Sequence, residues 1–292
     1  MTLNPVLLAP MVGKIQMARK STSRRASAYS RGGSATHSSG WYWLIIIILV
    51  LSVGGSVVTY QLWFKPPEYN KSTLCPKTGP EAGLVILLDL TDRIGATQHI
   101  RLRSILEKEV LDARQNTLIA VGAVNPNPGK RGIDFALCKP LEGSAANQLY
   151  QNPRLITKKY EMGFQKPFAA SLEKMLKAER ADRSPIMESL QAALAATPGF
   201  VDAEYPRRVI IVSDLLQHSA VFSFYRRDTW RKFQRSRDFE RLARTLHGVD
   251  VQILRLPRPK ARIDPVEVGD FWVNYFDQAG ARRIRYRMLG DL

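Results

Sequence analysis

Three short polar clusters carry the side chains best suited to chemistry. They are Asp89, Thr91, Asp92 and Arg93 after the apolar run LVILLDL; Ser184 in RSPIMESL; and Ser213 with Asp214 after RRVIIV. Carboxylate and hydroxyl oxygens supplied by separate loops are the ligands that Mg²⁺ or Ca²⁺ prefers, and Mg²⁺ commonly retains several waters. The sequence therefore predicts a hard-cation site if the three clusters meet in the fold.

The segments that would position these clusters alternate between strands and helices. Buried or alternating apolar runs predict strands at 84–90, 117–124, 133–138, 207–216, 249–256 and 282–288. Apolar stripes at helical spacing predict helices at 96–114, 159–180, 185–197, 229–247 and 266–279. Such alternation predicts a doubly wound α/β fold, with a mostly parallel sheet covered by helices on both faces.

One strand is expected to run against the others. The segment NPNPGKRG at 125–132 is a turn, and the alternating strand 133–138 follows it directly, as in a hairpin. We therefore expect an antiparallel edge strand. Sites in such sheets form at the carboxyl ends of the strands, so Asp89 and Asp214 should share one rim. Ser184 is expected to cap a helix whose first residue is Pro185.

The order of these clusters resembles the von Willebrand factor type A domain over roughly residues 82–290. That family has a doubly wound sheet with one antiparallel edge strand. Its metal-ion-dependent adhesion site combines Asp-x-Ser-x-Ser with a Thr and an Asp on later loops. The resemblance implies that Asp89, Thr91, Ser184 and Asp214 hold Mg²⁺ and that a partner carboxylate completes its shell.

A narrower resemblance is to a group of bacterial membrane-anchored proteins of this fold, and it supplies no activity. The segments that carry it are LCPKTGP, DLTDRIGATQ, SPIMESLQ, VSDLLQHS and DFWVNYFDQAGA.

Arg93 departs from the family pattern, because it stands where the second Ser is expected. A guanidinium within about 5 Å of a divalent cation costs Coulomb energy. One alternative is that Arg93 turns outward and leaves Asp92 near the ion. The other is that Arg93 replaces the ion by pairing with Asp89 and Asp214, which would make the site structural. Asp92, Arg93 and Ser213 are therefore treated as modulators of the site.

Three function classes stay open on the sequence. The leading one is a protein-binding module that acts through the rim. The second is a carboxylate-dependent metal hydrolase or phosphatase with Asp89 as nucleophile, although Thr91 interrupts the Asp-x-Asp spacing of that chemistry and no Gly-rich phosphate loop follows. The four histidines show no ligand spacing, and only His218 could reach the rim. The third is a structural envelope component without metal.

Residues 41–64 form an uncharged apolar stretch of 24 residues. At about 1.5 Å of rise per residue, such a helix spans the roughly 30 Å hydrocarbon core of a bilayer. Aromatic residues that favour the headgroup region stand at both ends, namely Trp41, Tyr42, Trp43, Tyr60, Trp63 and Phe64. The sequence predicts a single transmembrane helix.

Flanking charge predicts the orientation of this helix. Residues 1–40 carry six Lys or Arg and no acidic residue, whereas residues 65–80 carry three Lys. Positive charge is retained on the cytoplasmic side. We expect a disordered basic cytoplasmic tail at 1–40, a Pro-rich linker at 65–82, and a periplasmic von Willebrand A-like domain at 83–292, anchored in the bacterial inner membrane.

The cysteines and the charge suggest what the exported domain contains and contacts. Cys75 and Cys138 are an even number in an exported domain, which favours a disulfide over two free thiols.

The net charge is +17, with a basic, aromatic-interleaved segment at 225–262. Phosphate binding by this segment is conceivable, but export disfavours nucleic acid, so an anionic membrane surface or an acidic protein is expected there. No small-molecule substrate is expected.

Overall fold

The computed structural model describes residues 40–63, 67–91, 94–127, 132–148, 151–177, 181–243, 245–258 and 262–289. The chain divides into two compact units, Met1–Lys65 and Pro66–Leu292. The expected disordered tail lies outside the described residues, apart from Gly40 at the start of the first helix.

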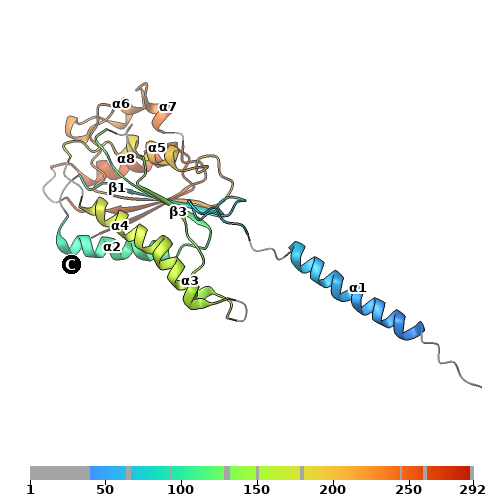
Figure 1. Ribbon diagram of the computed structural model, residues 1–292. Coiled ribbons are helices and arrows are strands. Elements are labelled where there is room, and N and C mark those ends of the chain that lie inside the picture. The colour runs from blue at the N-terminus through green and yellow to red at the C-terminus, as the bar shows by residue number, and fades with distance from the viewer. Residues whose placement is uncertain are drawn as a thin grey trace, which may run out of the picture. The chain divides into compact units, whose positions relative to one another are not determined.

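The described residues of the first unit form the helix α1 (Gly40–Trp63), which is 24 residues long (Figure 1). Its segment Gly40–Tyr60 is long and apolar enough to cross a membrane. The hydroxyls of Ser52, Ser56 and Thr59 donate to backbone carbonyls one turn earlier in the helix. These polar side chains are therefore satisfied within the helix, as a lipid environment requires.

The second unit is built on a sheet of six strands in the order β3-β2-β1-β4-β5-β6. The strands are β1 (Ala82–Leu88), β2 (Thr117–Ala123), β3 (Phe135–Cys138), β4 (Arg207–Ser213), β5 (Asp250–Arg255) and β6 (Arg283–Met288). All neighbouring pairs are parallel except β2 and β3, which are antiparallel. The predicted fold class, including the antiparallel edge strand, is confirmed.

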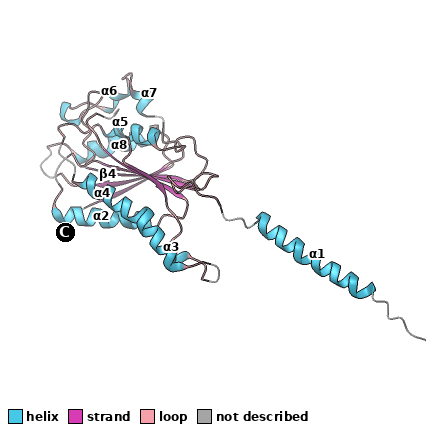
Figure 2. Ribbon diagram, viewed as in Figure 1, coloured by secondary structure: helices cyan, strands magenta, loops and turns pink. Residues whose placement is uncertain are grey.

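Helices cover both faces of the sheet (Figures 1 and 2). On one side lie α2 (Ala96–Leu111), α3 (Pro153–Tyr160) and α4 (Lys166–Leu176), with the π-helical turn Glu161–Gln165 joining the last two. On the other side lie α5 (Ile186–Ala196), α6 (Trp230–Gln234), α7 (Phe239–Leu242) and α8 (Pro265–Gln278). Short 3₁₀ turns occur at Gly143–Ala145 and Phe224–Arg226.

Strand β1 explains why both faces need cover. All seven of its residues are buried, and successive side chains point to opposite faces. Leu84, Ile86 and Leu88 pack with α2 and α4, whereas Val85 and Leu87 pack with α5 and α8. The continuous apolar run is therefore what a central strand between two helical layers requires.

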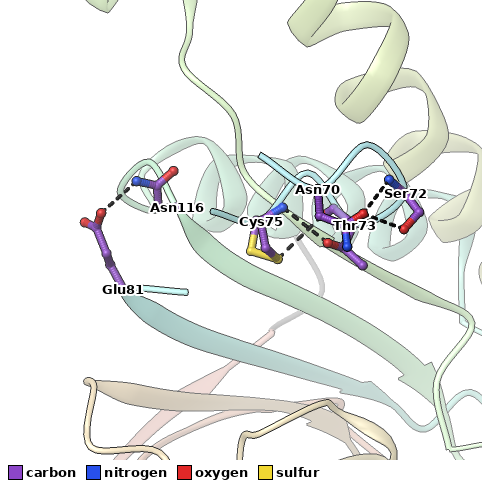
Figure 3. Close-up of a disulfide and its surroundings, with 7 residues drawn as sticks. Asn70, Ser72, Thr73, Cys75, Glu81 and Asn116 are labelled. Atoms are coloured by element: carbon purple, nitrogen blue, oxygen red, sulfur yellow. Dashed lines mark hydrogen bonds between the residues drawn. A yellow bond between two sulfur atoms is a disulfide. The ribbon is translucent and has the colours of Figure 1, made fainter. Parts of the chain in front are cut away.

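The segment before β1, expected as an extended linker, is folded against the sheet. Cys75 and Cys138 form a disulfide, with their Cα atoms 4.8 Å apart (Figure 3). Backbone hydrogen bonds extend the attachment, because the Cys138 N–H donates to Thr73 and the Asn70 N–H donates to Cys75. The segment thus belongs to the same compact unit as the sheet, and the predicted bridge ties it to β3.

The predicted helix 229–247 is wrong. The described residues of this segment form two short helices, α6 and α7, separated by a turn at Ser236. The cause is aromatic packing: Trp230, Phe233 and Phe239 contact one another, with ring centroids 5.3 to 5.9 Å apart. Trp230 and Phe233 also contact Phe271 of α8, at 5.5 and 5.9 Å. A straight helix would not place all three rings in this cluster. The expectation that these aromatics face the core is met.

Candidate functional site

The rim forms because β1 and β4 are parallel neighbours that end side by side. Leu88 is in register with Val212, and the Asp89 N–H donates to the Val212 carbonyl at 2.8 Å. The residues that follow each strand therefore emerge next to each other. This places Asp89 beside Ser213 and Asp214 at the carboxyl edge of the sheet, where such folds form their sites.

The carboxylate of Asp89 gathers three hydroxyl groups. Thr91 Oγ1 donates to Oδ1 at 2.9 Å, while Ser184 Oγ and Ser213 Oγ donate to Oδ2 at 2.8 and 2.7 Å. Asp89 is only 4% exposed, so these donors replace most of the water that an ionised carboxylate would otherwise require. The structure thus brings the three predicted clusters together around one carboxylate.

Ser184 does not cap the helix as expected. Helix α5 begins at Ile186, Pro185 stands at its N-cap, and the Ser184 hydroxyl donates to Asp89 instead. A hydrogen bond from a hydroxyl to a buried carboxylate is stronger than a hydrogen bond between a hydroxyl and a neutral backbone amide at a helix terminus. Two backbone hydrogen bonds between Ser184 and His218 hold the hydroxyl in this direction.

Asp214 lies in a strained turn after β4. Leu215 has a φ of 67°, which is unusual for a bulky residue, because a side chain is sterically disfavoured in the left-handed region. Three hydrogen bonds hold the turn: Leu216 N–H to Asp214 Oδ1 at 2.9 Å, Leu215 N–H to Ser213 Oγ at 2.7 Å, and Trp272 Nε1 to the Leu215 carbonyl at 2.8 Å. Backbone strain of this kind is concentrated at functional sites.

Arg258 is the residue at the rim that the sequence analysis missed. Its Nε lies 2.9 Å from Asp214 Oδ2, as an ion pair with a carboxylate only 7% exposed. The signal was available, since Arg258 follows β5, whose carboxyl end meets the same rim. Asp92 and Arg93 lie outside the described residues, so the predicted role of Arg93 stays a prediction.

Burial and charge perturb the titration of the rim. Burial and the neighbouring carboxylate of Asp89 raise the pKa of Asp214 to about 7. The Leu216 amide acts in the opposite direction, and the ion pair with Arg258 also favours the charged form. Burial, with Asp214 and Asp89 nearby, raises the pKa of Tyr225 as well. The rim therefore holds two buried carboxylates, of which Asp214 is paired with the Arg258 guanidinium and also interacts with the charge of Arg255.

A polar cavity of about 320 Å³ opens over the two carboxylate loops. Its lining includes Thr91, Ser184, Asp214, His218 and Tyr225. His218 reaches the rim, as the sequence suggested, and its ring packs against Tyr225 with centroids 5.2 Å apart. The cavity is open to an incoming side chain of small or moderate size.

The donor set fits a hard cation. Asp89, Thr91, Ser184 and Asp214 offer oxygen atoms only, and no cluster of three or more His, Cys, Asp or Glu occurs in the described part of the chain. A cation here would depend on hydroxyls and water besides the two carboxylates, which suits Mg²⁺. A bound cation would also relieve the repulsion between the two carboxylates that, together with burial, raises the pKa of Asp214.

No protein-family model and no curated protein matches the chain. Solved structures do. An aerotolerance-related membrane protein from Bacteroides fragilis is 14% identical, with a TM-score of 0.33 over 70% of this chain and 90% of its own. A von Willebrand factor type A protein from Catenulispora acidiphila is 12% identical, with a TM-score of 0.31; the match covers 69% of this chain and 43% of that protein.

Both similarities concern the fold alone. The architecture that the von Willebrand A resemblance implied, a doubly wound sheet with one antiparallel edge strand, is present in the strand order and strand directions. The resemblance is thus confirmed for the fold. The metal site that it implied stays a prediction.

Proposed function

We propose that this chain is a membrane-anchored protein-binding module whose binding surface is the rim around Asp89 and Asp214. The observation that carries the proposal is the convergence of three hydroxyls on the buried Asp89 carboxylate, beside a second buried carboxylate and under an open cavity. Oxygen-rich rims on this kind of fold suit the capture of another protein's polar side chain. Helix α1 would hold the module at a membrane.

The finer part of the proposal concerns Mg²⁺. Asp89, Thr91, Ser184 and Asp214 would hold the ion, and a carboxylate of the partner would complete its coordination. When bound, Mg²⁺ supplies the positive charge that attracts that carboxylate. Ser213 orients Asp89 through its hydrogen bond to Oδ2, and Arg258 offsets the charge of Asp214.

The proposed location is the bacterial inner membrane, with the N-terminus in the cytoplasm and the second unit in the periplasm. Two observations support it. The segment that precedes α1, residues 1–40, carries six Lys or Arg, whereas the flanking segment 65–80 carries three. The Cys75–Cys138 disulfide is the kind of bond that persists in oxidising compartments and is rare in the cytosol.

The Arg258–Asp214 ion pair favours a second candidate, a structural envelope component without bound metal. In that scheme the guanidinium is the internal cation, in the role that the sequence analysis considered for Arg93. The hydroxyls around Asp89 would then serve only to stabilise its buried charge.

Calorimetric titration of Mg²⁺ into the full chain in nanodiscs separates the two candidates. We expect saturable binding by the wild type, weakened roughly tenfold or more by Asp89→Ala or Asp214→Ala. Asp238→Ala is the matched control, since Asp238 is a more exposed carboxylate paired with Arg241 away from the rim strands. An absence of saturable binding by the wild type would favour the structural candidate.

The same variants test the binding function in membranes. Affinity capture with the wild type should retain a specific protein in Mg²⁺ and lose it in a chelator or with Asp89→Ala, while Asp238→Ala retains it. Equal capture by Asp89→Ala would show that the rim is not the binding surface.

A further inference from the structure

Strand β6 leaves one edge of the sheet open. It is the last strand in the order and pairs only with β5 among the residues that the structure describes. Alternate residues of a parallel strand direct their backbone groups to one side or the other. About half of the N–H and C=O groups of Arg283–Met288 therefore face the open edge, where a further strand could bond to them.

The side chains of β6 divide into two kinds by face. Arg283, Arg285 and Arg287 are exposed on one face, and none of them forms an ion pair within the described part of the chain. Asp250, which is in register with Arg283, is already paired, because Arg282 donates to its two carboxylate oxygens at 2.8 and 2.7 Å. The three guanidinium groups are thus available to an outside carboxylate.

The opposite face of β6 carries Ile284, Tyr286 and Met288. Ile284 packs against the core, Tyr286 and Met288 are 45% and 50% exposed, and the Arg255 guanidinium lies 6.0 Å from the centroid of the Tyr286 ring. A strand added at this edge would therefore meet a cationic row on one face and an apolar row on the other. That pattern specifies the partner: acidic and apolar residues should alternate along it.

Charged residues on an edge strand commonly serve only to prevent unwanted pairing. This explains why a second copy of the chain does not suit the edge, since three arginines would face three arginines. The same charges favour an acidic strand, however, because its carboxylates would attract the guanidinium groups of β6. Arginine is also better adapted than lysine to bidentate pairing with a carboxylate.

We propose that the open edge of β6 binds an extended acidic segment of another protein as a seventh strand. Asp or Glu at alternate positions of that segment would pair with Arg283, Arg285 and Arg287, and its apolar residues would cover Tyr286 and Met288. This interaction surface does not depend on the function proposed for the rim.

The probe is a fluorescein-labelled ten-residue peptide of alternating Glu and Val, added to the full chain in zwitterionic nanodiscs. We expect saturable fluorescence polarisation that weakens with added salt. The triple substitution Arg283→Thr, Arg285→Thr and Arg287→Thr should weaken binding about tenfold, as expected for the loss of three cross-strand ion pairs. Threonine favours strands, so β6 should remain folded.

The matched control substitutes three exposed arginines of the basic segment by threonine, namely Arg231, Arg235 and Arg237. It changes the net charge equally and should leave the affinity within about twofold of the wild type. Hydrogen exchange should slow at the amides of 283–288 when the peptide binds. Equal losses in both triple variants, no binding by the wild type, or binding without amide protection in β6 would each overturn the proposal.

Discussion

At the scale of single residues, Asp228 is the anchor of the loop beside the rim. Its carboxylate is 2% exposed and contacts Arg226 at 2.8 Å and Lys232 at 2.5 Å. It also accepts the backbone N–H of Ser223, whose hydroxyl contacts His218 at the cavity. Burial alone would raise the pKa of Asp228, but Lys232, the Ser223 amide and Arg226 together lower it.

This lowered pKa predicts an acid-dependent loss of stability. Asp228 takes up its proton at a lower pH in the folded state than in the unfolded state, so its contribution is complete above the unfolded pKa of about 4 and disappears as the pH falls further. Asp228→Asn should therefore cost about 1 to 3 kcal/mol at pH 7, and the difference should shrink toward pH 2. Urea unfolding at several pH values measures it; a difference independent of pH would contradict the prediction.

The sequence predicts which residues lie at the rim more readily than it predicts their hydrogen-bond partners there. Asp89, Thr91, Ser184, Ser213 and Asp214 follow from strand ends that the sequence shows plainly. The direction of the Ser184 hydroxyl does not follow, because a serine before a helix is compatible with capping until the buried Asp89 is known to lie beside it. Arg258 required the strand-end rule to be applied to β5 as well.

At the scale of elements, helix α8 fixes the geometry of the Asp214 turn. Trp272 is fully buried, and its indole N–H donates to the carbonyl of Leu215, the residue with positive φ. The rim is thus supported by a helix that contributes no oxygen ligand to it. The strain at Leu215 is tolerated because the surrounding packing determines its backbone.

Removing this hydrogen bond should loosen the turn. Trp272→Phe removes the indole donor from the buried Leu215 carbonyl, which still accepts the Gln217 N–H at 3.0 Å, and we expect a loss of about 1 kcal/mol in unfolding free energy from this hydrogen bond. Hydrogen exchange at the amides of Leu215 and Leu216 should accelerate more than exchange elsewhere in β4. Trp230→Phe is the control, since Trp230 lies in the aromatic cluster of α6; equal acceleration at the turn in both variants would contradict this role for Trp272.

Elements buried on both faces were the easiest to predict, and elements shaped by tertiary contacts the hardest. β1 is apolar throughout, β2 after its first residue, and β4 over Val209–Val212, because helices cover both sides of these strands. The basic segment that became α6 and α7 has helical spacing, but its rings are drawn into contacts with Phe271, which lies far along the chain. No local pattern contains that information.

At the scale of the whole molecule, the oxidation state of the two cysteines provides a test of the orientation of the membrane helix. The orientation proposed for α1 depends on charge, whereas the disulfide depends on the compartment that receives the second unit. If export is what oxidises Cys75 and Cys138, then reversing the helix should prevent the bond from forming.

Moving positive charge from one end of α1 to the other should therefore change the oxidation state of Cys75 and Cys138. Neutralising Arg19, Lys20, Arg24 and Arg25 to Ser, while inserting four Lys after residue 66, places the positive charge beyond the helix and should retain the second unit in the cytoplasm. Alkylation of acid-quenched cells should then label both cysteines in the inverted variant and neither in the wild type. Cys75→Ser, which leaves Cys138 as a single thiol, calibrates the labelling. Full protection of both cysteines in a variant that a reporter fused after residue 64 shows to be inverted would mean that the bond forms independently of export.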